Sequence, residues 1–174
     1  MTEFEALYER YARDVFRFSL CLCGNRAAAE DITSETFVRA WNASGPIRTA
    51  SAKAYLFTIA RNFYLEGQRR AGSNAASHAE MEEDIPDRAA APDAAAASRC
   101  ELRRVLAALG ELPEIDRTVL LLRAQEECSY EEIAQATGLS LAAVKVKIHR
   151  ARVRLAAWRA RAAANIPVRK GEKP

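Results

Sequence analysis

The sequence predicts an all-α protein built from two small helical domains. Its 174 residues are 49% hydrophobic but only 7% aromatic, and alanine supplies much of the apolar content. β-Branched runs are scarce, whereas the helix-favouring residues Ala, Leu, Arg and Glu abound. Apolar residues recur at helical spacing in two stretches, separated by a segment rich in alanine, acids and proline. We therefore expect helical domains at 1–72 and 99–160, a flexible acidic linker at 73–98 and a basic disordered tail at 161–174.

Three helices are expected in the first domain, at about 2–23, 26–41 and 51–70. Gly24 can end the first helix, and the side chain of Asn25 can cap the second. Three helices of this length can enclose one small core. The residues expected to face that core are Phe4, Leu7, Tyr8, Tyr11, Val15, Phe18, Leu22, Ile32, Phe37, Val38, Trp41, Leu56, Ile59, Ala60 and Phe63.

The second domain is expected to end in a helix-turn-helix. Ser129 with Glu132 three residues later matches a capping box, which marks the start of a helix. Gly138 can supply the positive φ that closes this helix, and Ser140 can cap the next one. An apolar face at helical spacing lets the two helices pack together. That face consists of Ile133, Ala134, Leu139, Val144 and Ile148.

Charge is distributed unevenly along the chain, although the formal net charge is only +3. Residues 129–174 contain ten Lys or Arg against three Asp or Glu, a net charge of +7, and residues 71–98 carry −5. A basic helix that follows a turn is typical of DNA-binding domains, in which the second helix enters the major groove. The C-terminal end is therefore expected to bind DNA, and the acidic segment to be a solvated linker.

The sequence lacks the features that are typical of membrane proteins, enzymes and metal-binding proteins. No apolar run approaches the roughly 20 residues that span a bilayer, and the first residues lack a signal-peptide layout, so we expect a cytoplasmic protein without membrane insertion. His78 and His149 lack partners in sequence for nucleophilic catalysis, and no glycine-rich phosphate loop is present, so we expect neither an enzyme nor a bound cofactor. The cysteines do not have the paired spacing of a metal site and are expected to be reduced. They are Cys21, Cys23, Cys100 and Cys128.

Several ordered motifs stand in the two predicted domains. They are Ala29–Trp41, Ala54–Asn62 with Arg69 and Arg70, Leu112–Glu114, Tyr130–Ala134 and Ala143–Arg152. In order and separation these segments resemble motifs of the sigma-70 family, namely its core-polymerase-binding helix, its promoter-melting helix and its fourth conserved region. The presence of only these two domains resembles the extracytoplasmic-function (ECF) group of that family.

The resemblance implies a transcription initiation factor that binds core RNA polymerase and directs it to promoter DNA. It implies a polymerase-binding surface formed by Asp31, Ser34, Glu35, Phe37 and Arg39. The resemblance also implies that the −10 element is recognised by Arg48, Tyr55, Arg61, Asn62, Arg69 and Arg70. It implies that the −35 element is recognised by Ser140, Ala142, Ala143, Lys145, Val146, Lys147 and Arg150. An anti-sigma factor is a further candidate partner.

Some of these positions can also be interpreted without the resemblance. Asp31 and Glu35 are four residues apart and share a helix face beside Arg39; on charge alone, an ordinary solvated face explains them as simply. Many members of the family have glutamine where this chain has Ser34. Ser34 forms a hydroxyl cluster with Thr33 and Thr36, and phosphorylation of this cluster is a hypothesis.

The recognition helix departs from the family pattern at three positions. Ala143 and Val146 can contact thymine methyl groups but cannot hydrogen-bond to a base edge, and Lys147 lacks the two-pronged donor of arginine. The −35 sequence is therefore expected to be unusual, or to be recognised largely through backbone and shape.

A stand-alone helix-turn-helix regulator is the alternative interpretation. Such a regulator would bind a symmetric site on duplex DNA without polymerase. It has no need of Asp31 and Glu35 or of the helix that carries Arg61 and Asn62, and the sequence shows no dimerisation heptad. These features favour the sigma factor.

Overall fold

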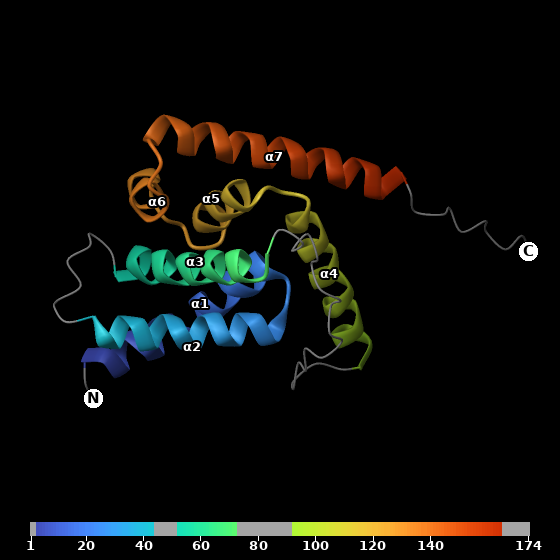
Figure 1. Cartoon of the computed structure of the whole chain (residues 1–174). Helices are drawn as coiled ribbons and strands as arrows, with labels where there is room; N and C mark the ends of the chain where they lie inside the picture. The colour runs from blue at the N-terminus through green and yellow to red at the C-terminus, as the bar shows by residue number, and fades with distance from the viewer. Residues whose placement is uncertain (1–2, 44–51, 73–91, 165–174) are drawn as a thin grey trace, which may run out of the picture.

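The computed structural model describes residues 3–43, 52–72 and 92–164, and these residues form helices without any strand (Figure 1). An all-α fold is thus confirmed for the part of the chain that is described. The helices are α1 (Glu3–Cys23), α2 (Arg26–Asn42), α3 (Ala52–Arg70), α4 (Pro92–Gly110), α5 (Glu114–Ala124), α6 (Tyr130–Thr137) and α7 (Leu141–Ala164). We call α1–α3 the N-terminal unit and α4–α7 the C-terminal unit.

The N-terminal unit is a three-helix bundle in which α2 packs on both α1 and α3. Val15, Phe18 and Leu22 lie at helical spacing on α1 and are fully buried, as the periodicity predicted. The rings of Phe18 and Phe57 meet at a centroid distance of 4.9 Å, which joins α1 to α3. Burial of such side chains contributes about 1.5–3 kcal/mol each and supplies most of the stability of the bundle.

The boundary between α1 and α2 follows local rules. Gly24 has φ +71°, a left-handed conformation that side chains other than glycine rarely adopt, and its N–H donates to the carbonyl of Leu20. The side chain of Asn25 accepts from the N–H of Ala28 at 2.8 Å and so caps α2. Both predicted roles are confirmed.

The C-terminal unit is arranged around α5, which packs on both α6 and α7. Val119 on α5 is fully buried and meets Ile133 of α6 and Val144 of α7, which are also fully buried, in one core. The N-terminal end of α7 therefore has one face toward α5 and α6 and the opposite face toward solvent.

Two boundaries differ from those expected. α4 begins at Pro92, inside the segment assigned to the linker, because proline with its fixed φ is well suited to the first turn of a helix. α7 extends to Ala164, past the expected start of the tail at 161, because the alanine- and arginine-rich sequence there favours helix.

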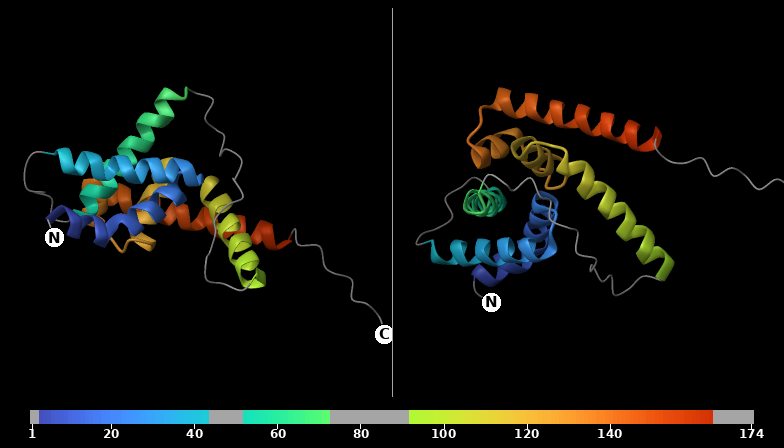
Figure 2. Two further views of the ribbon diagram at one scale, coloured as in Figure 1. Left: turned by 90° about the horizontal axis from the view of Figure 1, so that it is seen from below. Right: turned by 45° about the vertical axis from the view of Figure 1, so that its right-hand side comes forward.

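The two units pack against each other, with α3 lying between α2 on one side and α5 and α6 on the other (Figures 1 and 2). Buried residues of both units form one continuous apolar cluster. One face of α3 is therefore covered by the C-terminal unit, a relationship that the sequence alone did not predict. None of the helices in the described ranges combines the length and apolarity needed to cross a membrane.

Candidate nucleic-acid interface and docking groove

The helix-turn-helix formed by α6 and α7 has the local structure that its sequence predicted. The Ser129 hydroxyl accepts from the N–H of Glu132 at 3.1 Å, and the Glu132 carboxylate accepts from the N–H of Ser129 at 2.8 Å. Gly138 closes α6 with φ +71°, and the Ser140 hydroxyl accepts from the N–H of Ala143 at 3.2 Å. These local bonds determine the angle at which α7 leaves the turn.

Most of the residues predicted to contact the −35 element lie on the open side of α7. Val144, Ile148 and Ala151 face the core, and the opposite side of the helix is exposed. Ala143 is half-buried. The predicted residues that are exposed are Ser140, Ala142, Lys145, Val146 and Arg150.

Lys147 differs from these residues because it is paired inside the protein. Its ammonium nitrogen lies 3.3 Å from the Oδ1 atom of Asp116, which belongs to the first turn of α5. This pair connects the recognition helix to the helix beneath it. From its sequence position Lys147 is predicted among the DNA-contacting residues, and nothing in that position indicates Asp116 as its partner.

The residues predicted to contact the −10 element are divided along α3. Asn62, Arg69 and Arg70 are exposed, whereas Tyr55 is half-buried against the core. Arg48 lies outside the described residues. The predicted cations near the C-terminal end of α3 are thus open to solvent.

Arg61 is covered by the C-terminal unit. Its guanidinium donates to both carboxylate oxygens of Glu114 on α5, at 2.8 and 3.0 Å, and only 14% of its side chain is exposed. The Thr118 hydroxyl also donates to Glu114, at 2.8 Å. In this arrangement Arg61 is not free to contact DNA.

A second ionic contact between the units is formed around Glu126, whose side chain is fully buried. The ammonium of Lys53 on α3 lies 3.0 Å from its carboxylate and donates to its backbone carbonyl at 2.8 Å. Arg17 of α1 lies 3.6 Å from the same carboxylate. Burial outweighs these cations and raises the pKa of Glu126 above its ordinary value. A third contact joins the buried guanidinium of Arg117 to the carbonyl of Leu22.

The predicted polymerase-binding residues on α2 are also divided. Asp31 and Ser34 are exposed, and Phe37 is buried. Arg39 donates to Glu35 at 2.7 Å and to both oxygens of Glu66 on α3 at 3.0 and 2.9 Å. These bonds raise the pKa of Arg39 and lower that of Glu66. Arg39 therefore joins α2 to α3, and the freely exposed charge on this face belongs to Asp31.

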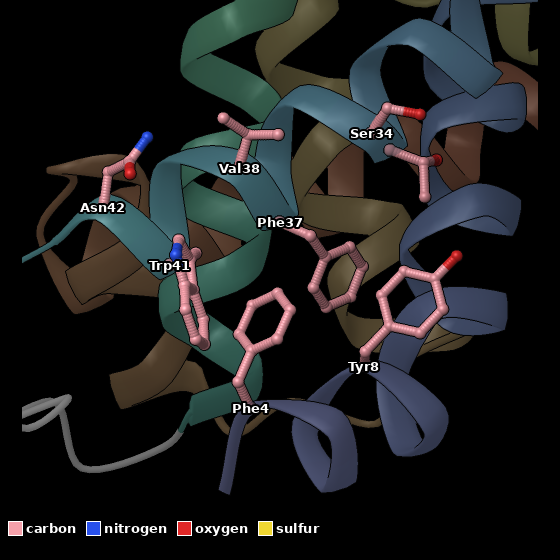
Figure 3. Close-up of a pocket in the computed structure, with 8 residues that line it drawn as sticks. Phe4, Tyr8, Ser34, Phe37, Val38, Trp41 and Asn42 are labelled. Carbon is pink, nitrogen blue, oxygen red and sulfur yellow. The ribbon is translucent and has the colours of Figure 1, made fainter. Parts of the chain in front are cut away.

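An apolar groove lies between α1 and α2, next to Ser34. It has a volume of about 510 Å³, and aromatic rings gather along it (Figure 3). The ring of Phe4 meets that of Trp41 at 4.7 Å, and the ring of Tyr8 meets that of Phe37 at 4.8 Å. Its lining residues are Phe4, Tyr8, Thr33, Ser34, Phe37, Val38, Trp41 and Asn42.

The groove corrects the expectation that Tyr8, Val38 and Trp41 belong to the core. Tyr8 is 48% exposed, Val38 is 51% exposed, and Trp41 is 61% exposed. Trp41 lies at the end of α2, where it packs on Phe4, and the described helices leave most of its side chain exposed. The hydroxyl cluster is also divided, since Thr36 is buried and donates to the Ile32 carbonyl, whereas Ser34 is exposed.

The described residues show no group of three or more His, Cys, Asp or Glu side chains placed to hold a metal ion. Cys128 is buried, and Cys21 and Cys23 are partly buried. These thiols are poorly ionised, because burial raises the pKa of both Cys21 and Cys128 to about 11 and also raises that of Cys23. The fourth cysteine, Cys100, is exposed on α4.

Two family models match the two units separately. Residues 7–73 match sigma-70 region 2, and residues 102–155 match sigma-70 region 4. The chain belongs to the sigma-70 family. Region 2 covers the three-helix bundle with the groove, and region 4 covers the helix-turn-helix.

Relatives place this sigma-70 protein in the ECF group. It is 32% identical over 159 residues to the ECF RNA polymerase sigma factor SigE of Mycolicibacterium smegmatis, covering 89% of the chain and 61% of SigE. It is 31% identical over 148 residues to SigL of Mycobacterium tuberculosis, covering 83% of the chain and 81% of SigL. It is 29% identical over 154 residues to SigM of Bacillus subtilis, covering 88% of the chain and 93% of SigM.

Two solved structures share this fold. The sigma factor RpoE, in complex with the anti-sigma factor NepR from Bartonella quintana, has a TM-score of 0.72 and 25% identity. That match covers 89% of this chain and 95% of RpoE. CnrH, in complex with the cytosolic domain of CnrY, has a TM-score of 0.65 and 27% identity, covering 94% of this chain and 89% of CnrH.

Three features of this ECF sigma factor are not among those predicted from its sequence: the acidic partners Glu114, Asp116 and Glu126, the covering of α3 by region 4, and the groove. The burial of Asp116 could have been predicted from the sequence, because it stands three residues before Val119 and therefore shares the inward face of α5. A lone carboxylate at such a position is expected to need a cation.

Proposed function

We propose that this ECF sigma factor binds core RNA polymerase through region 2 and directs it to promoters that have −10 and −35 elements. The observation that carries this proposal is the combination of an exposed basic recognition helix in region 4 with a second unit, region 2, that presents α2 and the groove. A stand-alone repressor would have no use for the second of these surfaces. The proposed limits are 1–72 for region 2, 73–98 for the linker, 99–160 for region 4 and 161–174 for the tail. Helix α4 extends back into this linker to Pro92, and α7 extends into this tail to Ala164.

Polymerase docking is assigned to the exposed side of α2 and to the groove beside it. Asp31 and Ser34 supply polar contacts, and Trp41 and Tyr8 supply apolar surface that is open to solvent. Exposed apolar patches that have a polar rim are typical of protein-binding surfaces. Glu35, Phe37 and Arg39 contribute to this proposed site by shaping it.

Promoter recognition is assigned to α7 and α3. The exposed cations Lys145 and Arg150 face the −35 element, and Asn62, Arg69 and Arg70 face the −10 element. Arg61 can contact DNA only after region 4 moves away from α3, because it is paired with Glu114 in the present arrangement. Tyr55 is half-buried against the core. Region 2 and region 4 are therefore expected to separate in the complex with polymerase.

An anti-sigma factor is a proposed partner of this chain. RpoE and CnrH, which share its fold, were both solved in complex with a second protein, and NepR is an anti-sigma factor. We also place this chain in the cytoplasm, where core polymerase and promoter DNA are present.

The decisive experiment mixes the purified chain with sigma-free core RNA polymerase and measures complex formation and transcription from promoters of its own genome. Asp31→Arg should weaken the complex without changing thermal stability, because its side chain is exposed. Trp41→Ala should also weaken the complex, at a small cost in stability because the ring contact with Phe4 is lost. Val153→Ala is the matched control, since Val153 is 54% exposed on α7, away from the groove. Tight unaided binding to a palindromic duplex, with no polymerase complex, would support the stand-alone regulator instead.

A further inference from the structure

Lys147 is the one predicted −35 residue that forms an ion pair with another side chain among the described residues. The distance from its Nζ to Oδ1 of Asp116 is 3.3 Å, and the exposed fractions of the two side chains are 23% and 2%. Lys145 and Arg150, on the same helix, are exposed, and the ammonium of Lys145 lies 5.7 Å from the centroid of the Tyr130 ring on α6. Of these three cations, only Lys147 is paired with a carboxylate of the described residues.

Asp116 needs this cation because of where it lies. It is in the first turn of α5 and is buried, and its second oxygen, Oδ2, is buried without a hydrogen-bond partner. Lys147 is the only cation paired with Asp116 among the described residues. A buried carboxylate left without a cation is strongly unfavourable, so the position of Asp116 on α5 favours one rotation of α7.

The position of Lys147 on α7 agrees with this role. Val144, Ile148 and Ala151 form the buried stripe of the helix, and Lys147 lies along the edge of that stripe. Its aliphatic stem can cover the apolar edge while its ammonium reaches Asp116. A rotation of α7 that freed Lys147 for DNA would also turn the buried stripe away from α5.

We propose that Lys147 is a positioning residue, which fixes the rotation of the recognition helix on α5 through Asp116 and does not itself contact the −35 bases. This inference rests on the proposed function, because it assumes that α7 binds the −35 element. The preference for a −35 sequence is then determined by the exposed residues of α7, which include Val146 and Arg150.

The test uses holoenzyme made from the full chain and measures its binding to promoters with a randomised −35 element. Lys147→Met and Asp116→Asn should each lower affinity about tenfold for all −35 sequences alike, because each leaves one buried group without its partner. Asp116 is too buried to contact DNA, so a loss caused by Asp116→Asn must act through the helix. The Lys147→Arg variant should keep most of the affinity of the original chain, since the guanidinium of arginine can also pair with Asp116.

The double variant Asp116→Leu with Lys147→Met gives the sharpest result. Replacing both charges by apolar side chains of similar size removes the unpaired group, which is often neutral for stability. Affinity, base preference and salt dependence should therefore return close to those of the original chain. If the double variant stays as weak as Lys147→Met, or if Lys147→Met relaxes the preference at one base pair only, Lys147 contacts DNA and the proposal is wrong.

Lys145→Met is the matched comparison, because Lys145 is exposed two residues earlier on the same helix. If Lys145 contacts a phosphate, its loss should reduce the salt slope by about 0.9, whereas Lys147→Met should leave the slope unchanged. Hydrogen exchange of the α7 amides in the free chain gives a readout that does not depend on polymerase. Both single variants at the ion pair should speed this exchange and the double variant should restore it, even if the holoenzyme fails to form; unchanged exchange in the single variants would overturn the proposal.

Discussion

Arg61 of α3 and Glu114 of α5 form a bidentate (two-pronged) ion pair that joins region 2 to region 4. Both carboxylate oxygens accept from the guanidinium, at 2.8 and 3.0 Å, and the two side chains are 14% and 24% exposed. Two-pronged pairs of this kind fix orientation as well as distance. The same residue that is predicted to contact the −10 element therefore stabilises the packing of region 4 on α3.

Glu114→Gln is expected to weaken this packing. The substitution keeps the shape of the side chain and a hydrogen-bond acceptor for Thr118, but it removes the charge opposite Arg61. The expected loss is about 1.5–3 kcal/mol of the interaction between the units, the range for hydrogen bonds to charged groups. Small-angle scattering of the free chain should show a larger radius of gyration. Glu111→Gln, at an exposed position three residues earlier, should leave the radius unchanged; an equal effect of both variants would contradict the role of the pair.

The buried carboxylate of Glu126 predicts a dependence of stability on pH. Its pKa is raised in the folded protein, mainly by burial, with a smaller contribution from Asp14, whereas Lys53 and Arg17 act in the opposite direction. The folded chain therefore binds this proton more tightly than the unfolded chain, in which the pKa is about 4.3. The contribution of Glu126 to the free energy of unfolding should rise as pH falls from 7 toward the unfolded pKa.

Glu126→Gln isolates this contribution because glutamine resembles the protonated acid. Thermal unfolding should show the variant to be more stable than the original chain at pH 7, with the difference shrinking as pH falls toward 5. Other groups that titrate in this range affect both proteins and cancel in the comparison. A difference that stayed constant with pH, or that grew on acidification, would mean that Lys53 and Arg17 dominate over burial.

The helices and their ends could be predicted from the sequence because they depend on residues close together in the chain. The capping box at Ser129, the turn at Gly138 and the cap at Asn25 each involve residues within four positions of one another. Apolar spacing likewise identified most of the buried face of each helix. It failed for Trp41 because periodicity gives the direction of a side chain and not whether a third element covers it.

The packing of region 4 on α3 could not be predicted in the same way. The ion pair of Arg61 joins residues 53 apart, and that of Lys147 joins residues 31 apart. Nothing in the spacing of either cation indicates its partner, because the contact depends on how whole helices dock. The sequence therefore indicated which residues carry charge, and the structure shows which of those charges are already paired.

The four thiols are expected to differ sharply in reactivity. Burial raises the pKa of Cys21 and Cys128 to about 11, and also raises that of Cys23, so almost none of these groups is thiolate at pH 7. Cys100 is exposed on α4. Brief treatment with iodoacetamide should label Cys100 alone, as measured by mass spectrometry of peptides, and Cys100→Ser should abolish this rapid labelling. All four should react in urea; rapid labelling of Cys21 or Cys128 in the folded chain would show that these thiols are more open than their burial indicates.

Two glycines offer a matched pair of substitutions with opposite expected effects. Gly138 has φ +71° at the end of α6, whereas Gly67 lies within α3 with ordinary helical backbone. A Cβ atom at either position meets no other atom within 4 Å, so neither substitution causes a clash. Gly138→Ala should therefore cost about 1 kcal/mol of stability, from the strained backbone alone. Gly67→Ala should add about 0.5–1 kcal/mol, because alanine favours helix. Urea unfolding of both variants measures the difference, and a loss of stability in Gly67→Ala would indicate that α3 has to bend at this position.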